Sequence, residues 1–201
     1  MTAPSIGFRA LTAADLPLLH RWLCEPHVVE WWEPAPTFEA VEEDYLPRLS
    51  ADDVLPLDAP AGVVQFIARE GDEPFGYIQC YRVMAHQADG WWLDEADPFA
   101  VGIDQFIALP DRLGQGLGTR MLRAFIDRIF EDPRVTRIQT DPDPTNARAI
   151  AAYRKAGFVD VEAVETPNGP ALLMRIDRGS YDLGSGSIQG NEESRAKNRF
   201  R

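Results

Sequence analysis

A glycine-rich turn is the first feature of this sequence that suggests chemistry. Gly114, Gly116 and Gly118 alternate with other residues directly before an apolar run at helical spacing. The N–H groups of a helix N-terminus point outward and its dipole favours an anion, so such a turn suits a phosphate. A dinucleotide fingerprint would need glycine at Thr119, and a P-loop would need a lysine, which this turn lacks. Another kind of phosphate loop and a tight turn without a ligand remain open.

A second segment of interest runs from Asn146 to Phe158, with Ile150 and Tyr153 between them. Ile150 and Tyr153 are spaced to share one face of a helix, and Asn146 lies on its first turn. Gly157 suits the left-handed position that commonly follows a helix. The segment therefore predicts a helix that ends at Gly157, with a tyrosine hydroxyl available near its middle.

The elements that must position these residues alternate along the chain. We expect strands at residues 6–11, 63–69, 75–83, 101–108, 135–140, 158–164 and 171–176. Turns at Gly71-Asp72 and Asn168-Gly169 predict two hairpins. We expect helices from Thr12 (with Asp15 in a capping box), over 37–47, after Gly118 and over 146–156, and loops at 50–62 and 84–99. The pattern predicts one α/β (α+β) domain over residues 1–178 and a polar tail without fixed structure over 179–201.

The glycine turn and the segment 146–158 together resemble the two signature segments of the GNAT N-acetyltransferase superfamily. The resemblance implies a mixed, mostly antiparallel sheet with flanking helices, splayed where acetyl-CoA binds as the acetyl donor. It also implies that Asn146 bonds the cofactor arm and that Tyr153 lies near the sulfur. Leu113 stands where the superfamily usually has Arg or Gln. The other implied cofactor-binding residues are Phe106, Ile107, Ala108, Gly114, Gln115, Gly116, Leu117, Gly118 and Thr119.

Segments outside the cofactor site are similar to those of aminoglycoside 6′-N-acetyltransferases. They are residues 30–32, 45–47, 76–79, 89–92, 102–105 and 139–142, in loops and strand ends where packing alone would not demand them. The implied partner is a polycationic aminoglycoside, held by carboxylates through charge-assisted hydrogen bonds and by flat aromatic faces. We expect one ring of each pair Trp31-Trp32 and Trp91-Trp92 to pack and Trp22 to lie in the core. The implied substrate-binding residues are Trp32, Tyr45, Gln79, Asp89, Trp91, Trp92, Asp104, Asp141 and Asn168.

The reaction implied is direct transfer in a ternary complex. Aminolysis of a thioester needs an acceptor for the amine proton and a donor for the departing thiolate. Asp104 is the expected acceptor and Tyr153 the expected donor, so Cys24 and Cys80 need not be nucleophiles. The alternatives are a buried, ion-paired Asp104 and a Tyr153 that only packs.

Composition narrows the class of protein. A formal net charge of −12 argues against a nucleic-acid partner and is compatible with steering of a cationic substrate. No apolar run is long enough to span a membrane, and the first residues lack the pattern of a signal peptide. The three histidines are isolated, so we expect no metal. We expect a cytoplasmic monomer or homodimer.

Two rival functions stay open. One is a siderophore-biosynthesis acyltransferase acting on N6-hydroxylysine, a subgroup with a similar pattern that typically has histidine where Asp104 stands. The other is a non-catalytic GNAT-like module that binds acyl-CoA or a drug. Asp104 and the acid-rich loops favour the polycationic sugar.

Overall fold

Seven strands form one sheet in the order β1-β2-β3-β4-β5-β7-β6. The structure is a computed structural model that describes residues 5–32, 34–50, 57–59 and 62–181. All neighbouring strands are antiparallel except β4 and β5, which are parallel, so the predicted mixed, mostly antiparallel sheet is confirmed. The strands are β1 (Ile6–Ala10), β2 (Val63–Glu70), β3 (Glu73–Arg82), β4 (Ala100–Ile107), β5 (Arg137–Thr140), β6 (Val159–Thr166) and β7 (Gly169–Asp177).

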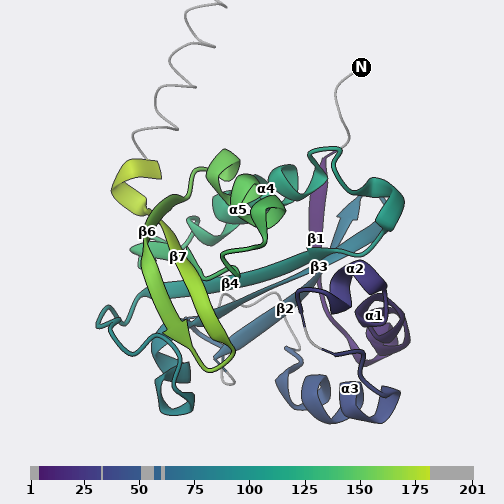
Figure 1. Ribbon diagram of the computed structural model, residues 1–201. Coiled ribbons are helices and arrows are strands. Elements are labelled where there is room, and N and C mark those ends of the chain that lie inside the picture. Colours follow the sequence, from purple (N-terminus) through teal and green to yellow (C-terminus); the bar gives the residue numbers. More distant parts are fainter. Residues whose placement is uncertain (1–4, 33, 51–56, 60–61, 182–201) are drawn as a thin grey trace, which may run out of the picture.

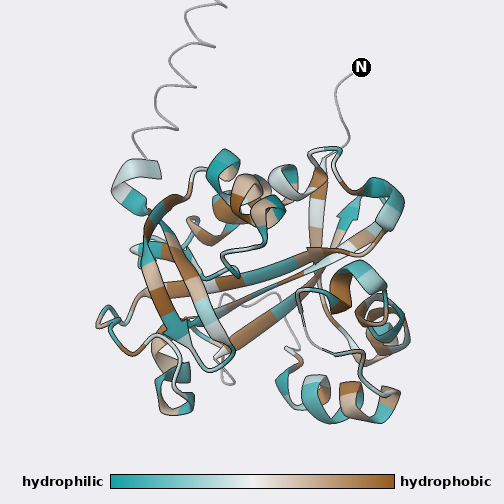
Figure 2. Cartoon of the chain, in the orientation of Figure 1, coloured by the Kyte–Doolittle hydropathy of each residue, from teal (hydrophilic) through white to brown (hydrophobic). Residues whose placement is uncertain are grey.

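Helices cover both faces of this sheet (Figure 1). On one face lie α4 (Leu117–Ile129) and α5 (Ala147–Ala156). On the other lie α1 (Leu16–Leu23), α2 (Pro26–Val29) and α3 (Phe38–Tyr45), which is followed by a 3-10 turn at Leu46–Arg48. Apolar residues concentrate on the strands and on the inward helix faces (Figure 2). The two buried clusters therefore sit on opposite faces of the sheet.

Local signals explain where the helices begin and end. The backbone N–H and the hydroxyl of Thr12 both donate to Asp15 Oδ2, at 2.9 and 2.6 Å, as the capping-box pattern predicted. Thr37 Oγ1 accepts a hydrogen bond from Ala40 N at the start of α3. Gly157 follows α5 with φ +113°, a conformation that glycine adopts without steric cost. Each of these signals involves only residues that are close neighbours along the chain.

Alternation along the strands assigns the side chains of the central strands to two faces. Ile67, Tyr77 and Phe106 pack against α1, α2 and α3 in one cluster. Gln79 lies two residues after Tyr77 on β3, and Asp104 lies two residues before Phe106 on β4. Because side chains alternate between the two faces of a strand, Gln79 and Asp104 belong to the same face as Tyr77 and Phe106. On this face the sheet therefore changes from apolar under the helices to polar beyond them.

The sheet opens between β4 and β5. Their pairing covers three positions, ending where Gly102 lies opposite Gln139. Strand β5 ends at Thr140, while β4 continues to Ile107 along β3. The strands separate beyond Gly102, which leaves the side of β4 that faced β5 without a strand partner, as the resemblance predicted.

Three expectations need correction. The segment 84–99 is not all loop, because Val83–Asp89 forms a 3-10 helix that ends at the left-handed Gly90. The strand expected over 135–140 begins at Arg137. The first residues of the expected tail have a defined structure: a helical turn follows β7, and Tyr181 packs on Phe130 with ring centroids 4.7 Å apart. The rest of the expected tail, 182–201, and much of the expected 50–62 loop lie outside the described residues.

Candidate active site

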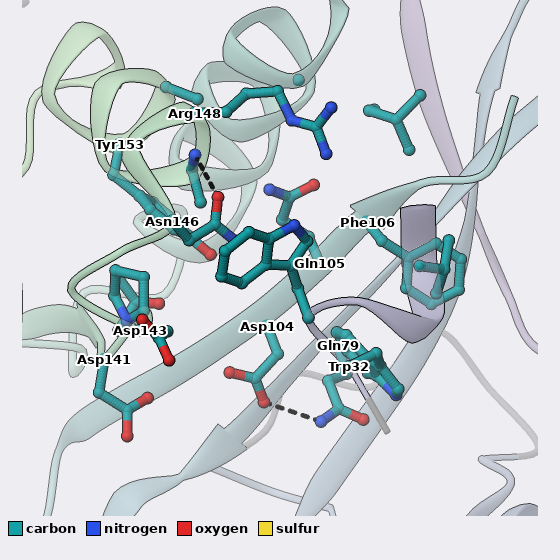
Figure 3. Close-up of a pocket in the computed structure, with 18 of the residues that line it drawn as sticks. Trp32, Gln79, Asp104, Gln105, Phe106, Asp141, Asp143, Asn146, Arg148 and Tyr153 are labelled. Atoms are coloured by element: carbon teal, nitrogen blue, oxygen red, sulfur yellow. Dashed lines mark hydrogen bonds between the residues drawn. The ribbon is translucent and has the colours of Figure 1, made fainter. Parts of the chain in front are cut away.

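A cavity of about 1260 Å³ lies where β4 and β5 separate. Its walls come from the loop before α4, the first turns of α5, the segment after β5, and the aromatic residues around α2 and after β3. Figure 3 shows Asp104 and Gln79 on the sheet facing Asp141 and Tyr153 across the opening. One face of the cavity is thus acidic and aromatic, and the other is formed by helix N-termini.

A chain of hydrogen bonds crosses the strands below this cavity. The Tyr77 hydroxyl donates to Gln79 Oε1 at 2.8 Å, and Gln79 Nε2 donates to Asp104 Oδ2 at 2.9 Å. Gln79 lies directly opposite Asp104 in the register of β3 and β4. The sheet therefore holds the Asp104 carboxylate in place through the Gln79 amide.

Two carboxyl groups in the cavity hold protons more tightly than usual. Burial raises the pKa of Asp104 to about 6, although hydrogen bonds from Gln79 and Tyr81 oppose this change. Burial, together with the charge of Asp104, raises the pKa of Asp141 to about 8. Such values place proton exchange near neutral pH, where a general base is most effective. The pair is thus suited both to bind a cation and to take a proton.

Tyr153 reaches the cavity from α5 and is 4% exposed. Burial raises the pKa of its phenol, so the hydroxyl stays protonated at neutral pH and can donate a proton. Its ring packs edge-on against Phe158 at 5.3 Å. The ring of Tyr153 therefore packs in the core, while its protonated hydroxyl is compatible with a role as a proton donor.

Asn146 caps α5, and its Oδ1 accepts a hydrogen bond from Ala149 N at 3.0 Å. Its side-chain NH₂ group is left to donate into the cavity, which Asn146 lines. The same helix places Arg148 and Lys155 on the cavity wall, and Figure 3 shows Arg148 projecting over it. These two cations were not singled out from the sequence, because exposed basic residues on a helix carry no local signal of their own.

The glycine loop enters α4 as a site for an anion. Gly114 and Gly116 have φ values of +72° and +75°, and an added Cβ at either would meet no heavy atom within 4 Å. The first hydrogen bond of the helix runs from Arg120 N to Gly116 O, so the amides of residues 117–119 have no acceptor within the helix. Loop and helix together present these amides to the cavity, which fits a pyrophosphate. Arg112, next to Leu113, instead pairs with Glu70 at 2.6 Å.

The expected role of the β4 backbone needs one correction. Ala108 N donates to Phe75 O at 2.8 Å, so this group already belongs to the ladder with β3, and Ala108 does not line the cavity. Since backbone groups alternate along a strand, those of Gln105 and Ile107 face the gap instead. The carbonyl of Ile107 accepts a hydrogen bond from His27 Nε2 at 2.9 Å. Phe106 lines the cavity with its side chain.

Aromatic rings form the wall opposite the helix N-termini. Trp32 lies edge-on to Phe106 at 5.0 Å, and Trp92 tilts against Tyr81 at 6.4 Å. Trp31 and Trp91 also line the cavity, so both rings of each pair reach it, while Trp32 and Trp92 are the rings that pack against other aromatic side chains. Trp22 is 5% exposed in the core, as predicted. Tyr45 is buried and also reaches the cavity.

Most of the residues proposed from the sequence come together in this cavity. Asp89 does not, because it is exposed at the end of the 3-10 helix, and Gln115 bonds the Asp111 carbonyl outside it. Asn168 lines the rim from the hairpin between β6 and β7. Sequence reasoning missed Tyr81, although its spacing of two from Gln79 places both on one face of β3. The predicted site residues found in the cavity are Trp32, Tyr45, Gln79, Trp91, Trp92, Asp104, Phe106, Ile107, Gly114, Gly116, Leu117, Gly118, Thr119, Asp141, Asn146, Tyr153 and Asn168.

In the described part of the chain, no group of three or more His, Cys, Asp or Glu side chains is arranged to hold a metal ion. No helix among these residues is long and apolar enough to cross a membrane.

Comparisons with known proteins agree with this geometry. A family model described as an acetyltransferase (GNAT) domain matches residues 12–166. The aminoglycoside N(6′)-acetyltransferase type 1 of Klebsiella pneumoniae is 44% identical over 181 residues, covering 89% of this chain and 86% of the relative. A lysine N-acyltransferase of Mycobacterium tuberculosis is 25% identical over 175 residues, covering 87% and 78%.

Solved structures give the same result. The aminoglycoside acetyltransferase AAC(6')-Ib, in a crystal structure with coenzyme A and kanamycin, superposes with a TM-score of 0.80 at 44% identity. The match covers 89% of this chain and 98% of that one. This protein is therefore a member of the GNAT acetyltransferases and, within them, of the aminoglycoside 6′-N-acetyltransferase family.

Proposed function

We propose that this enzyme transfers the acetyl group of acetyl-CoA to the 6′-amine of aminoglycoside antibiotics and thereby confers resistance. The observation that carries the proposal is the meeting of an acidic, aromatic wall and an anion-binding loop in one cavity. A polycationic sugar suits the first, and the pyrophosphate of coenzyme A suits the second. We further propose that it acts in the cytoplasm, as a monomer or homodimer, without a nucleic-acid partner.

Binding of the donor is assigned to the loop and to α5. The backbone amides of residues 114–119 would hold the pyrophosphate, and Asn146 would donate to the pantetheine arm. The gap-facing backbone of Gln105 and Ile107 would take the place of a strand partner for that arm. The edge of β4 that lacks a strand partner beyond Gly102 lies beside the cavity, which supports this route.

Binding of the acceptor is assigned to the acidic and aromatic wall. Asp104 and Asp141 would accept hydrogen bonds from ammonium groups, and Trp32, Trp91 and Trp92 would supply flat faces for the sugar rings. Since both carboxyl groups have raised pKa values, an approaching cation would favour their ionised forms. The cavity is thus able to discriminate a cation from a neutral sugar.

The transfer itself needs three proton movements. Asp104 would accept a proton from the ammonium group, which frees the nitrogen lone pair to attack the thioester carbonyl carbon. As the C–N bond forms and the C–S bond breaks, the Tyr153 hydroxyl would give its proton to the departing thiolate. The nitrogen, positively charged after the attack, would then lose its second proton, which restores the Tyr153 phenol, and Asp104 would release its proton to solvent. The products are an N-acetyl aminoglycoside and coenzyme A, and no covalent enzyme intermediate is needed. Cys80, the buried thiol, has a raised pKa because of its burial, which suits a bystander.

The proposal is tested by thiol release from acetyl-CoA with kanamycin as acceptor. We expect turnover that Asp104→Asn largely abolishes while the melting temperature does not fall, because Asn keeps the shape and loses the charge. Release with N6-hydroxylysine but not with kanamycin would point to the lysine acyltransferases instead. Binding without release by the wild-type protein would indicate a non-catalytic module.

A further inference from the structure

The hydroxyl group of Tyr77 lies deep beneath the cavity and has no role in the reaction proposed above. Tyr77 is 0% exposed and does not line the cavity. Its hydroxyl nevertheless starts the chain of hydrogen bonds that ends on Asp104, through Gln79, with lengths of 2.8 and 2.9 Å. Burying a phenol hydroxyl lowers stability unless the hydroxyl makes a hydrogen bond. The bond to Gln79 satisfies the Tyr77 hydroxyl and also connects it to Asp104.

Three rings hold the Tyr77 side chain in one place. Phe106 stacks on it at 5.4 Å and 23°, while Trp32 and Tyr45 meet it edge-on at 5.8 and 6.0 Å. The hydroxyl therefore has a fixed position from which to meet Gln79. Burial raises the pKa of Tyr77 well above its usual value, so the phenol keeps its proton and donates it to Gln79 Oε1.

The direction of the chain matters because an amide has two different ends. If Gln79 presents Nε2 to Asp104, it donates to the carboxylate and stabilises the ionised form. If the amide is reversed, its oxygen faces the carboxylate oxygen and favours the protonated form. The phenol, donating to Oε1, selects the first arrangement.

We propose that Tyr77 is a positioning residue for the transfer reaction: its buried hydroxyl fixes the Gln79 amide with Nε2 toward Asp104, and so keeps the carboxylate oriented and ionised to take the amine proton. This inference rests on the proposed function, in which Asp104 is the proton acceptor. Other groups that face Asp104 are Tyr81 from β3, Asp141 after β5 and Tyr153 from α5. None of these contacts the Gln79 amide through a hydrogen bond among the described residues, so the Tyr77 effect is separable from theirs.

The test compares the protonation of Asp104 in the wild type, Tyr77→Phe, Gln79→Met and the double variant. Carboxyl titration by ¹³C NMR, with the Asp104 signal identified through its loss in Asp104→Asn, requires no turnover. We expect Tyr77→Phe to raise the pKa of Asp104 by about 0.5 to 1 unit, the range of one hydrogen bond. The low-pH limb of kcat/KM should move upward equally, lowering kcat/KM at pH 6 by about two- to fivefold.

The double variant separates positioning from packing. Gln79→Met should raise the pKa at least as far, and adding Tyr77→Phe to it should then change nothing further, because the phenol acts only through the amide. The double variant also leaves neither partner unpaired, so it should fold even where a single variant does not. The inference would be overturned if the pKa of Asp104 did not change in Tyr77→Phe. It would also be overturned if Tyr77→Phe shifted that pKa equally in the wild type and in the Gln79→Met background. Absence of wild-type acetyl transfer to kanamycin would refute the proposed function and leave the titration result standing.

Discussion

Tyr81 lies flat against Gly102, its partner across β3 and β4. A Cβ added to Gly102 would lie 2.3 Å from Tyr81 Cε2 and 2.8 Å from its hydroxyl oxygen. A larger residue fits this position only if the Tyr81 ring moves, because the ring occupies the space that a Cβ would need. Gly102 is also the last residue of β4 that pairs with β5, so it lies where the sheet opens.

Gly102→Ala should therefore damage the site more than the fold. The ring of Tyr81 must move, and overpacking of this kind costs about 1 to 3 kcal/mol of unfolding free energy. Since Tyr81 faces Asp104, kcat/KM for kanamycin should fall by about tenfold or more. Gly7→Ala is the matched control, because an added Cβ there meets nothing within 4 Å. Denaturant unfolding measures the change in stability, and steady-state kinetics measures the change in kcat/KM. Equal losses in Gly102→Ala and Gly7→Ala would contradict the role of the Gly102–Tyr81 contact.

Asp141→Asn should stabilise the free enzyme at high pH. The folded state holds the Asp141 proton up to about pH 8, whereas the unfolded chain releases it near pH 4. Between these values the folded state binds more protons, so the contribution of Asp141 lowers stability as pH rises. The melting temperature of the variant should exceed that of the wild type at pH 8 and approach it at pH 4.

Asp143→Asn is the control for that comparison. Hydrogen bonds from Thr145 lower the pKa of Asp143, so its ionised form contributes stability above about pH 4 that is lost on acidification. This variant should melt no higher than the wild type at pH 8. A gain there equal to that of Asp141→Asn would show that reduced net charge, not burial, is the cause.

Tyr153→Phe should keep the affinity for acetyl-CoA and lower kcat by about 10²-fold or more, because the ring still packs on Phe158 and only the proton donor is lost. Binding is measured by calorimetry and turnover by thiol release. Wild-type turnover in this variant would leave Tyr153 with a packing role alone.

Arg178→Ala should destabilise the domain although it lies outside the active site. The guanidinium donates to the carbonyl oxygens of Val135 and Phe130, at 2.6 and 3.1 Å, and to that of Asp132. Each carbonyl oxygen left without a hydrogen bond lowers the unfolding free energy by up to about 1 to 3 kcal/mol. Arg175→Ala is the control, since Arg175 makes only a 3.5 Å contact with Asp177 and should change stability by about 0.5 kcal/mol or less. Equal melting temperatures for the two variants would contradict this role.

Chain-local features were predictable from the sequence. The Thr12–Asp15 capping box, the left-handed Gly157 and the turn at Asn168-Gly169 depend on neighbours along the chain, and the structure has all three. The glycine loop before α4 belongs to the same class, because its amides are exposed by helix geometry itself.

What only the tertiary structure decided is how residues from distant segments meet. Register placed Gln79 opposite Asp104, and strand separation after Gly102 opened the cavity. Burial then raised the pKa values of Asp104 and Asp141, which no spacing in the sequence reveals. The same reason explains why Asp89, placed in the site from the sequence, lies outside the cavity lining, and why the Tyr77 hydroxyl was missed: a side chain's solvent exposure and hydrogen-bond partners depend on segments far away in the chain.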